Sequence, residues 1–110
     1  MDVYTIYADH TPKINAYHFA KKMKLFLDKM VELGHMESYR LTRMKLGFRS
    51  MDLPEFRIDM EFKNMQQLDD AMTSVLRNEE NIEGEHVGFN HMVDVNTIQH
   101  FLYRDFPDEV

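Results

Sequence analysis

Residues 55–76 read EFRIDMEFKNMQQLDDAMTSVL, and this stretch decides the fold. In its first half, apolar side chains at even positions from Phe56 to Phe62 alternate with charged side chains, which is the period of a strand with one buried face. From Met65 onward the apolar residues recur every three or four positions, which is the period of a helix. Asn64 and Gln67 have the spacing of a helix-capping box at the boundary. The stretch predicts a strand over residues 55–63 and a helix over residues 65–78.

The same two periods recur on either side of this stretch. Upstream, strand-like runs over residues 3–9 and 37–48 enclose a helical run over residues 16–33, and a strand-like run over residues 95–106 follows downstream. The order β-α-β-β-α-β predicts an α+β, ferredoxin-like fold, in which two helices cover one face of a four-stranded antiparallel sheet. At 110 residues, the chain is expected to form a single domain over residues 1–110.

Local signals refine this expectation. Both faces of the run over residues 3–9 are moderately apolar, so this strand is expected at the centre of the sheet. Asn15 is a candidate N-cap of the first helix, with Thr11 as the alternative start, and Gly34 is placed to end that helix in the left-handed conformation.

The run over residues 37–48 changes the parity of its apolar positions. Tyr39 and Leu41 are odd, whereas Met44, Leu46 and Phe48 are even. Because neighbouring side chains of a strand point to opposite faces, this shift predicts a β-bulge or a bend between Leu41 and Met44.

Composition excludes several classes of function. The formal net charge is -6, which disfavours binding to nucleic acid. There is no cysteine, which excludes disulfides, thiolate catalysis and cysteine-ligated metals. The amino-terminal residues lack the pattern of a signal peptide and no run has the apolar length of a membrane span, so we expect a cytoplasmic protein that does not contact membranes.

No catalytic motif stands out. His86 and His91 are five positions apart, which is not the spacing that places two metal ligands on one helix face, and no serine lies in a glycine-flanked elbow. The glycines form no phosphate-binding loop. We therefore expect neither a metal nor a cofactor, although a haem- or metal-dependent enzyme that uses His86 or His91 stays open as an alternative.

One group of residues combines polar atoms with aromatic bodies near the expected opening between sheet and helices. Such a mixture among apolar side chains is typical of a small-molecule site. The structural alternative is that His86 and Asn90 hydrogen-bond the loop to the sheet. The candidate ligand-binding residues are Tyr39, His86, Asn90, His91 and Tyr103.

A second group forms the charged side of the strand over residues 55–63, with a contribution from the strand before it. Helices on one face leave the other face of the sheet without cover, so a homodimer is expected. Charges on a face buried in that dimer need partners. The candidate dimer-face residues are Arg40, Arg57, Asp59 and Glu61.

The pattern resembles the dimeric α/β-barrel superfamily, which includes antibiotic-biosynthesis-type monooxygenases. The segments ESYRLTRMKLG (residues 37–47), EFRIDMEFKNMQQLDDA (residues 55–71) and FLYRDFPD (residues 101–108) are similar to those of a small uncharacterised bacterial family of this fold. The resemblance implies a homodimer whose two sheets form a barrel, with a pocket between sheet and helices in each subunit. Some members oxidise aromatic or quinol-like substrates without a cofactor, and others bind haem through a histidine. This chain has no tryptophan, so a catalytic tryptophan of such members has no counterpart here.

Two main interpretations follow for function. The first is a protein that binds a small apolar or aromatic molecule and oxidises it without a metal. The second is a non-catalytic binding or assembly module whose pocket is filled by its own side chains. An open cavity between sheet and helices favours the first interpretation, and a filled interior favours the second.

Overall fold

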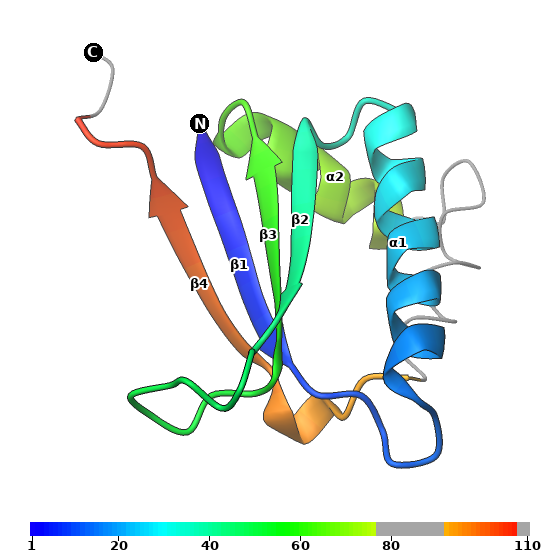
Figure 1. Ribbon diagram of the computed structural model, residues 1–110. Coiled ribbons are helices and arrows are strands. Elements are labelled where there is room, and N and C mark those ends of the chain that lie inside the picture. Colours follow the sequence, from blue (N-terminus) through cyan, green and yellow to red (C-terminus); the bar gives the residue numbers. More distant parts are fainter. Residues whose placement is uncertain (77–91, 108–110) are drawn as a thin grey trace.

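The computed structural model describes residues 1–76 and 92–107 (Figure 1). The elements follow the expected order, and a short 3-10 helix precedes the last strand. Their bounds are β1 Asp2–Ala8, α1 Ala16–Glu32, β2 Ser38–Arg43, β3 Phe56–Phe62, α2 Met65–Leu76, η2 Val95–Thr97 and β4 Gln99–Arg104.

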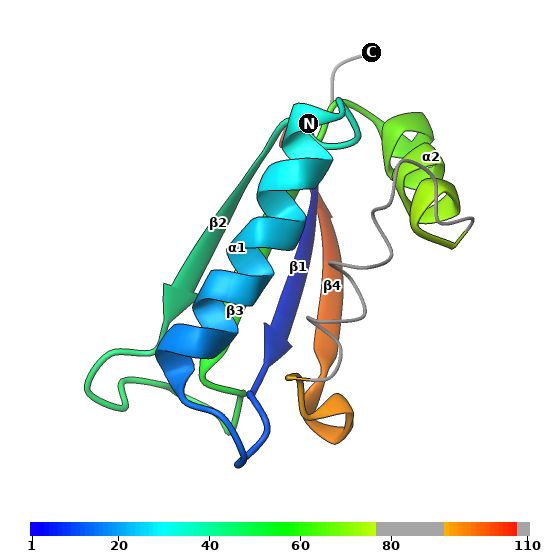
Figure 2. The same ribbon diagram turned by 90° about the vertical axis from the view of Figure 1, so that its right-hand side faces the viewer.

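The four strands form one antiparallel sheet in the order β2-β3-β1-β4. The prediction that the first strand lies at the centre is confirmed, because β1 pairs with β3 on one side and with β4 on the other. Figures 1 and 2 show α1 along one face of the sheet and α2 on the same side, set apart from α1. This arrangement is the ferredoxin-like fold.

Register assigns each strand residue to a face of the sheet. Tyr39 pairs with Met60, and Met60 pairs with Tyr4, so these three side chains share the face that the helices cover. Even positions of β1, β3 and β4 and odd positions of β2 lie on this helix-facing side. The remaining positions lie on the opposite side, which we call the open face.

The core lies between the sheet and the two helices. Residues from the helix-facing side of β3 pack against the apolar stripe of α1, as the helical spacing predicts. The buried apolar residues are Ala8, Phe19, Met23, Phe26, Leu27, Met30, Met36, Phe56, Ile58, Met60, Phe62, Ala71 and Val93.

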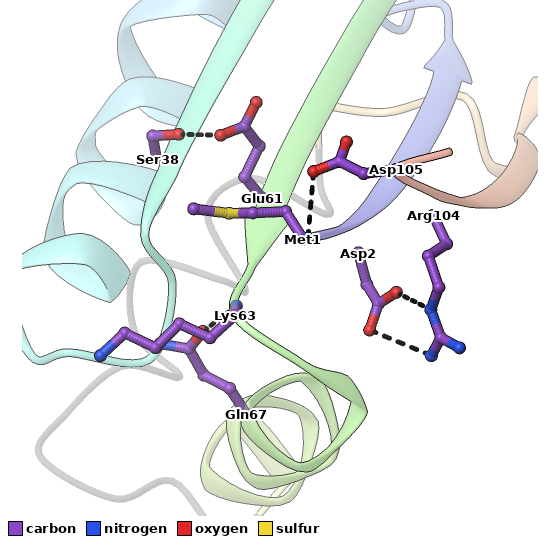
Figure 3. A network of polar contacts seen from close by, with 8 residues as sticks. All are labelled: Met1, Asp2, Ser38, Glu61, Lys63, Gln67, Arg104 and Asp105. Carbon is purple, nitrogen blue, oxygen red and sulfur yellow. Dashed lines mark hydrogen bonds and ion pairs between the residues drawn. The ribbon is translucent and has the colours of Figure 1, made fainter. Parts of the chain in front are cut away.

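The expected helix boundaries are formed by the predicted residues. The Asn15 side chain accepts a hydrogen bond from the His18 amide at 2.8 Å, and Gly34 has a φ of +79° after α1. At α2, Asn64 Oδ1 accepts from the Gln67 amide at 2.9 Å. The Gln67 side chain reaches one residue further back than expected and accepts from the Lys63 amide at 2.6 Å (Figure 3).

The prediction of a bulge or a bend between Leu41 and Met44 was wrong for the residues that pair in β2. Pairing is continuous from Ser38 with Glu61 to Arg43 with Phe56, and β2 ends there. The even apolar residues that produced the parity shift lie in the loop that follows, where Leu46 and Phe48 are exposed. The strand is therefore shorter than the run over residues 37–48.

The last strand is also shorter than the expected run over residues 95–106. Asp94 caps η2 by accepting a hydrogen bond from the Asn96 amide at 3.2 Å, and the Thr97 hydroxyl donates to the Asp94 carbonyl at 2.6 Å. The Asp9 amide donates to Thr97 Oγ1 at 3.0 Å. These bonds hold residues 95–97 in a turn beside the end of β1.

Polar contacts join the first and last strands at the other end of the sheet. Arg104 Nε donates to Asp2 Oδ1 at 2.7 Å, and the amino-terminal ammonium group of Met1 pairs with Asp105 at 3.0 Å (Figure 3). Charged groups therefore hold β1 and β4 together at this end, where Asp2 pairs with Arg104 in register.

Candidate functional site

A cavity of about 350 Å³ lies between the helix-facing side of the sheet and the two helices. Its walls are almost entirely apolar. The strands contribute Ile6 and Ala8 among others, and the helices contribute aliphatic and aromatic side chains. Methionines come from several elements and from the α1–β2 connection, and they are Met23, Met30, Met36, Met60 and Met72. Because methionine is flexible and polarisable, such a wall adapts to ligands of different shape.

One polar pair interrupts this wall. The Tyr4 hydroxyl and Nδ1 of His100 are 3.0 Å apart, and both residues line the cavity. Burial raises the pKa of Tyr4, so its phenol is held in the neutral form. When the phenol donates to Nδ1, the neutral imidazole carries its proton on Nε2. The pair can therefore offer one N–H donor to a ligand that has an acceptor.

The sheet brings these two residues together from opposite ends of the chain. Ile6 pairs with His100 and Tyr4 pairs with Leu102, so Tyr4 and His100 are diagonal neighbours on β1 and β4. Both occupy even positions, which point to the helix-facing side. Sequence reasoning missed this pair, although a tyrosine and a histidine at helix-facing positions of two strands were a usable signal.

Two of the five predicted ligand-binding residues, Tyr39 and Tyr103, lie in the described part of the chain, and the sheet places them on opposite faces. Tyr39 is on the helix-facing side of β2, where its hydroxyl donates to Asp28 Oδ1 at 2.5 Å. Burial, together with the hydrogen bond and the charge of Asp28, raises the pKa of Tyr39 to about 12. This residue ties β2 to α1 and is not among the described residues that line the cavity.

Tyr103 lies on the other side of the sheet. It pairs with Val3, which pairs with Glu61, so its side chain belongs to the open face. The structure therefore separates Tyr103 from Tyr39. The other three candidates, His86, Asn90 and His91, lie outside the described residues.

The four predicted dimer-face residues all lie on the open face. Arg40 pairs in register with Asp59, and Arg57 and Glu61 lie on either side of Asp59 along β3. Arg57 Nε is 3.0 Å from Asp59 Oδ2, and the buried Thr5 hydroxyl donates to Asp59 Oδ1 at 2.6 Å. Although burial opposes it, the hydrogen bond and charge of Asp59 raise the pKa of Arg57.

The open face has an aromatic half beside this charged half. We call Tyr7, Phe101 and Tyr103 the aromatic strip. The Arg57 guanidinium lies 5.6 Å from the centre of the Tyr7 ring, which joins the two halves. Phe101 is 42% exposed and Tyr103 is 54% exposed, so the strip leaves apolar surface in contact with solvent.

Residues 1–76 and 92–107 hold no candidate metal site, because no group of three or more His, Asp or Glu side chains there is placed to hold a metal ion. In the same residues, no helix combines the length and the apolar character needed to cross a membrane.

A family model described as a family of unknown function (DUF6614) matches residues 1–110, the whole chain. The chain belongs to this family. Its description assigns no activity, and no curated protein matches the chain. The family therefore identifies relatives without identifying a reaction.

Solved structures share the fold. A protein of Arabidopsis thaliana matches 100% of this chain and 100% of its own, with a TM-score of 0.77 and 6% identity. A dimeric ferredoxin-like protein of unknown function from Jannaschia sp. CCS1 covers 94% of this chain and 98% of its own, with a TM-score of 0.68 and 9% identity. One of the same description from Thermobifida fusca covers 93% and 88%, with a TM-score of 0.63 and 7% identity. These matches confirm the fold, and they do not confirm a resemblance to monooxygenases.

Proposed function

We propose that the protein binds a small, largely apolar molecule with one hydrogen-bond acceptor in the cavity between sheet and helices. The observation that carries this proposal is the cavity itself, an apolar space of about 350 Å³ interrupted by the Tyr4–His100 pair. Small-molecule sites have volumes of ~300–1,000 Å³ and combine apolar walls with a few placed polar groups. A carbonyl, ether or quinone-like oxygen on a hydrocarbon or aromatic body fits both features.

Competition with a solvatochromic dye such as 8-anilinonaphthalene-1-sulfonate tests this proposal. The dye reports an apolar cavity, and a panel of aromatic ketones, quinones and matching hydrocarbons displaces it in proportion to affinity. We expect the oxygen-bearing compounds to bind more tightly than their hydrocarbon counterparts. Equal displacement by both series would contradict a role for the polar pair.

Variants connect the binding to this cavity. Tyr4→Phe removes the hydroxyl and should weaken only the oxygen-bearing ligands, whereas Ile6→Phe fills space and should weaken both series. Tyr7→Phe is the matched control, because Tyr7 lies on the same strand but on the open face. Binding that is unchanged in Tyr4→Phe and Ile6→Phe would place the ligands outside this cavity and contradict the proposal. No binding by the wild type would favour the alternative of a non-catalytic assembly module.

We also propose that two copies of the chain form a homodimer through their open faces, as in a dimeric α/β barrel. The aromatic strip supports this proposal, because it leaves Phe101 and Tyr103 partly exposed on a face that the helices do not cover. The dimeric description of the Jannaschia and Thermobifida proteins gives it further support. An interface of this type buries on the order of 2,000 Å² or more.

Sedimentation velocity tests the assembly. We expect a dimer at micromolar concentration for the full chain and a monomer for Phe101→Glu, which places a charge in the interface. Tyr17→Glu is the control, since Tyr17 is an exposed aromatic residue on α1. A monomeric wild-type protein at this concentration would contradict the proposed dimer.

A further inference from the structure

The loop between β2 and β3, residues 44–55, extends away from the helix layer toward the side of the open face (Figure 1). It displays three large apolar side chains to solvent. Leu46 is 80% exposed, Phe48 is 83% exposed and Met51 is 66% exposed. Three large exposed apolar side chains within six residues indicate an interaction surface more strongly than a single exposed residue does.

The backbone at the tip of this loop has an unusual conformation. Leu46 has a φ of +57° and Gly47 a φ of +70°, and the Phe48 amide donates to the Lys45 carbonyl at 3.1 Å. Two successive residues with positive φ form the turn in which asparagine and glycine are preferred. A leucine there is strained, and its exposed side chain lacks the burial that would offset that strain within residues 1–76 and 92–107.

The base of the loop is held in place. The Met44 amide donates to the Glu55 carbonyl at 2.8 Å, and the Glu55 amide donates to Asp9 Oδ1 at 2.7 Å. Further along, the Arg49 guanidinium donates to the Leu53 carbonyl at 2.8 Å. These contacts fix the direction of the loop before any partner binds, which lowers the ordering cost of association.

We propose that this loop is an arm that packs against a second copy of the chain, with Leu46 and Phe48 as its anchoring side chains. This inference rests on the proposed homodimer. The loop lies on the same side as the open face, so two open faces that meet bring each loop toward the other copy. The contact would bury the strained leucine and add apolar surface to the contact made by the aromatic strip.

Dimer dissociation constants of the full chain and its variants test the arm. Phe48→Ser should raise the dissociation constant by about tenfold or more, as expected for an aromatic anchor. Tyr17→Ser is the matched control, because it also truncates an exposed aromatic residue, on α1. It should leave the dissociation constant unchanged.

Leu46→Gly provides a second test, in which the stability of the monomer and the stability of the dimer should change in opposite directions. Glycine tolerates a positive φ, so the melting temperature of the monomer, measured well below the dissociation constant, should rise. The same substitution removes an anchor, so the dimer should dissociate more readily. A merely tolerant surface loop would show the first effect without the second, and that result would overturn the inference.

The outcomes separate the arm from the dimer on which it rests. If the wild-type protein is a monomer at every concentration measured, the proposed homodimer and the proposed arm both fail. If it is a dimer that Phe101→Glu dissociates, while Phe48→Ser and Leu46→Gly leave its dissociation constant unchanged, the homodimer stands and the arm is overturned. The loop would then face solvent or a different partner.

Discussion

On the open face, the carboxylate of Asp59 has its partners within its own subunit. Asp59 accepts from Arg57 on its own strand and from the Thr5 hydroxyl on β1, and Thr5 is fully buried. A carboxylate that satisfies a buried hydroxyl contributes more to stability than an exposed ion pair does. Asp59 therefore has a structural role inside one subunit.

Replacing Asp59 with Ala should lower the free energy of unfolding by about 1–3 kcal/mol, because the Thr5 hydroxyl loses its acceptor while buried. The second substitution Thr5→Val removes the buried hydroxyl that no longer has an acceptor. The double variant should therefore regain part of the lost free energy of unfolding. Denaturant unfolding of both variants measures the effect. Equal losses in the single and the double variant would show that the Thr5 contact is unimportant.

Tyr39 gives stability a dependence on alkaline pH. Its pKa is raised to about 12 in the folded protein from an ordinary value of 10.0, so the folded state favours the neutral phenol. The contribution is fully present below pH 10 and is lost as pH rises toward 12. Unfolding curves across this range should show stability falling more steeply for the wild type than for Tyr39→Phe. Identical slopes would contradict the assignment.

Only part of the candidate site was predictable at the residue scale. The sequence indicates a cavity between sheet and helices, but it does not reveal which polar residues reach it. Tyr4 and His100 are 96 positions apart, and only the register of β1 against β4 makes them neighbours. Tyr103 was assigned to the cavity because the parity of the last strand was not anchored to a neighbouring strand.

The helices and strands were predicted more reliably than the residues of the candidate site. Periodicity and capping signals are local, so the strand at Phe56–Phe62 and the starts of both helices were correct in type and position. The second strand was extended too far because apolar Met44, Leu46 and Phe48 continue into the loop. A pattern of apolar residues cannot separate a bulge from a loop that displays apolar side chains for another purpose.

The start of α2 offers a test at this scale. Asn64 accepts from the Gln67 amide, which has no partner within the first turn of the helix. Asn64→Ala should lower the free energy of unfolding by about 1 kcal/mol, and Asn64→Gly by only a few tenths. Thermal or denaturant unfolding distinguishes the two. Equal destabilisation by both substitutions would show that the side-chain cap is not the cause.

At the scale of the whole molecule, the two sides of the sheet are specialised differently. The helix-facing side forms one wall of the cavity, and the open face combines an ion pair with the aromatic strip. Both β2 and β4 are edge strands, whereas β1 is paired on both sides. The proposed ligand and the proposed second copy therefore meet opposite faces of the same strands.

The central position of β1 has a consequence for the order of folding. Asp2 and Arg104, which join the ends of β1 and β4, are 102 positions apart, so this pairing must close almost the entire chain. Pairings between distant segments slow folding, because loop entropy is lost before contacts form. A circular permutant that links the carboxyl end to Met1 and opens the chain between Pro12 and Lys13 makes β4–β1 a hairpin. Stopped-flow refolding should be faster for this permutant, and an unchanged rate would mean that β4 docks after the rate-limiting step.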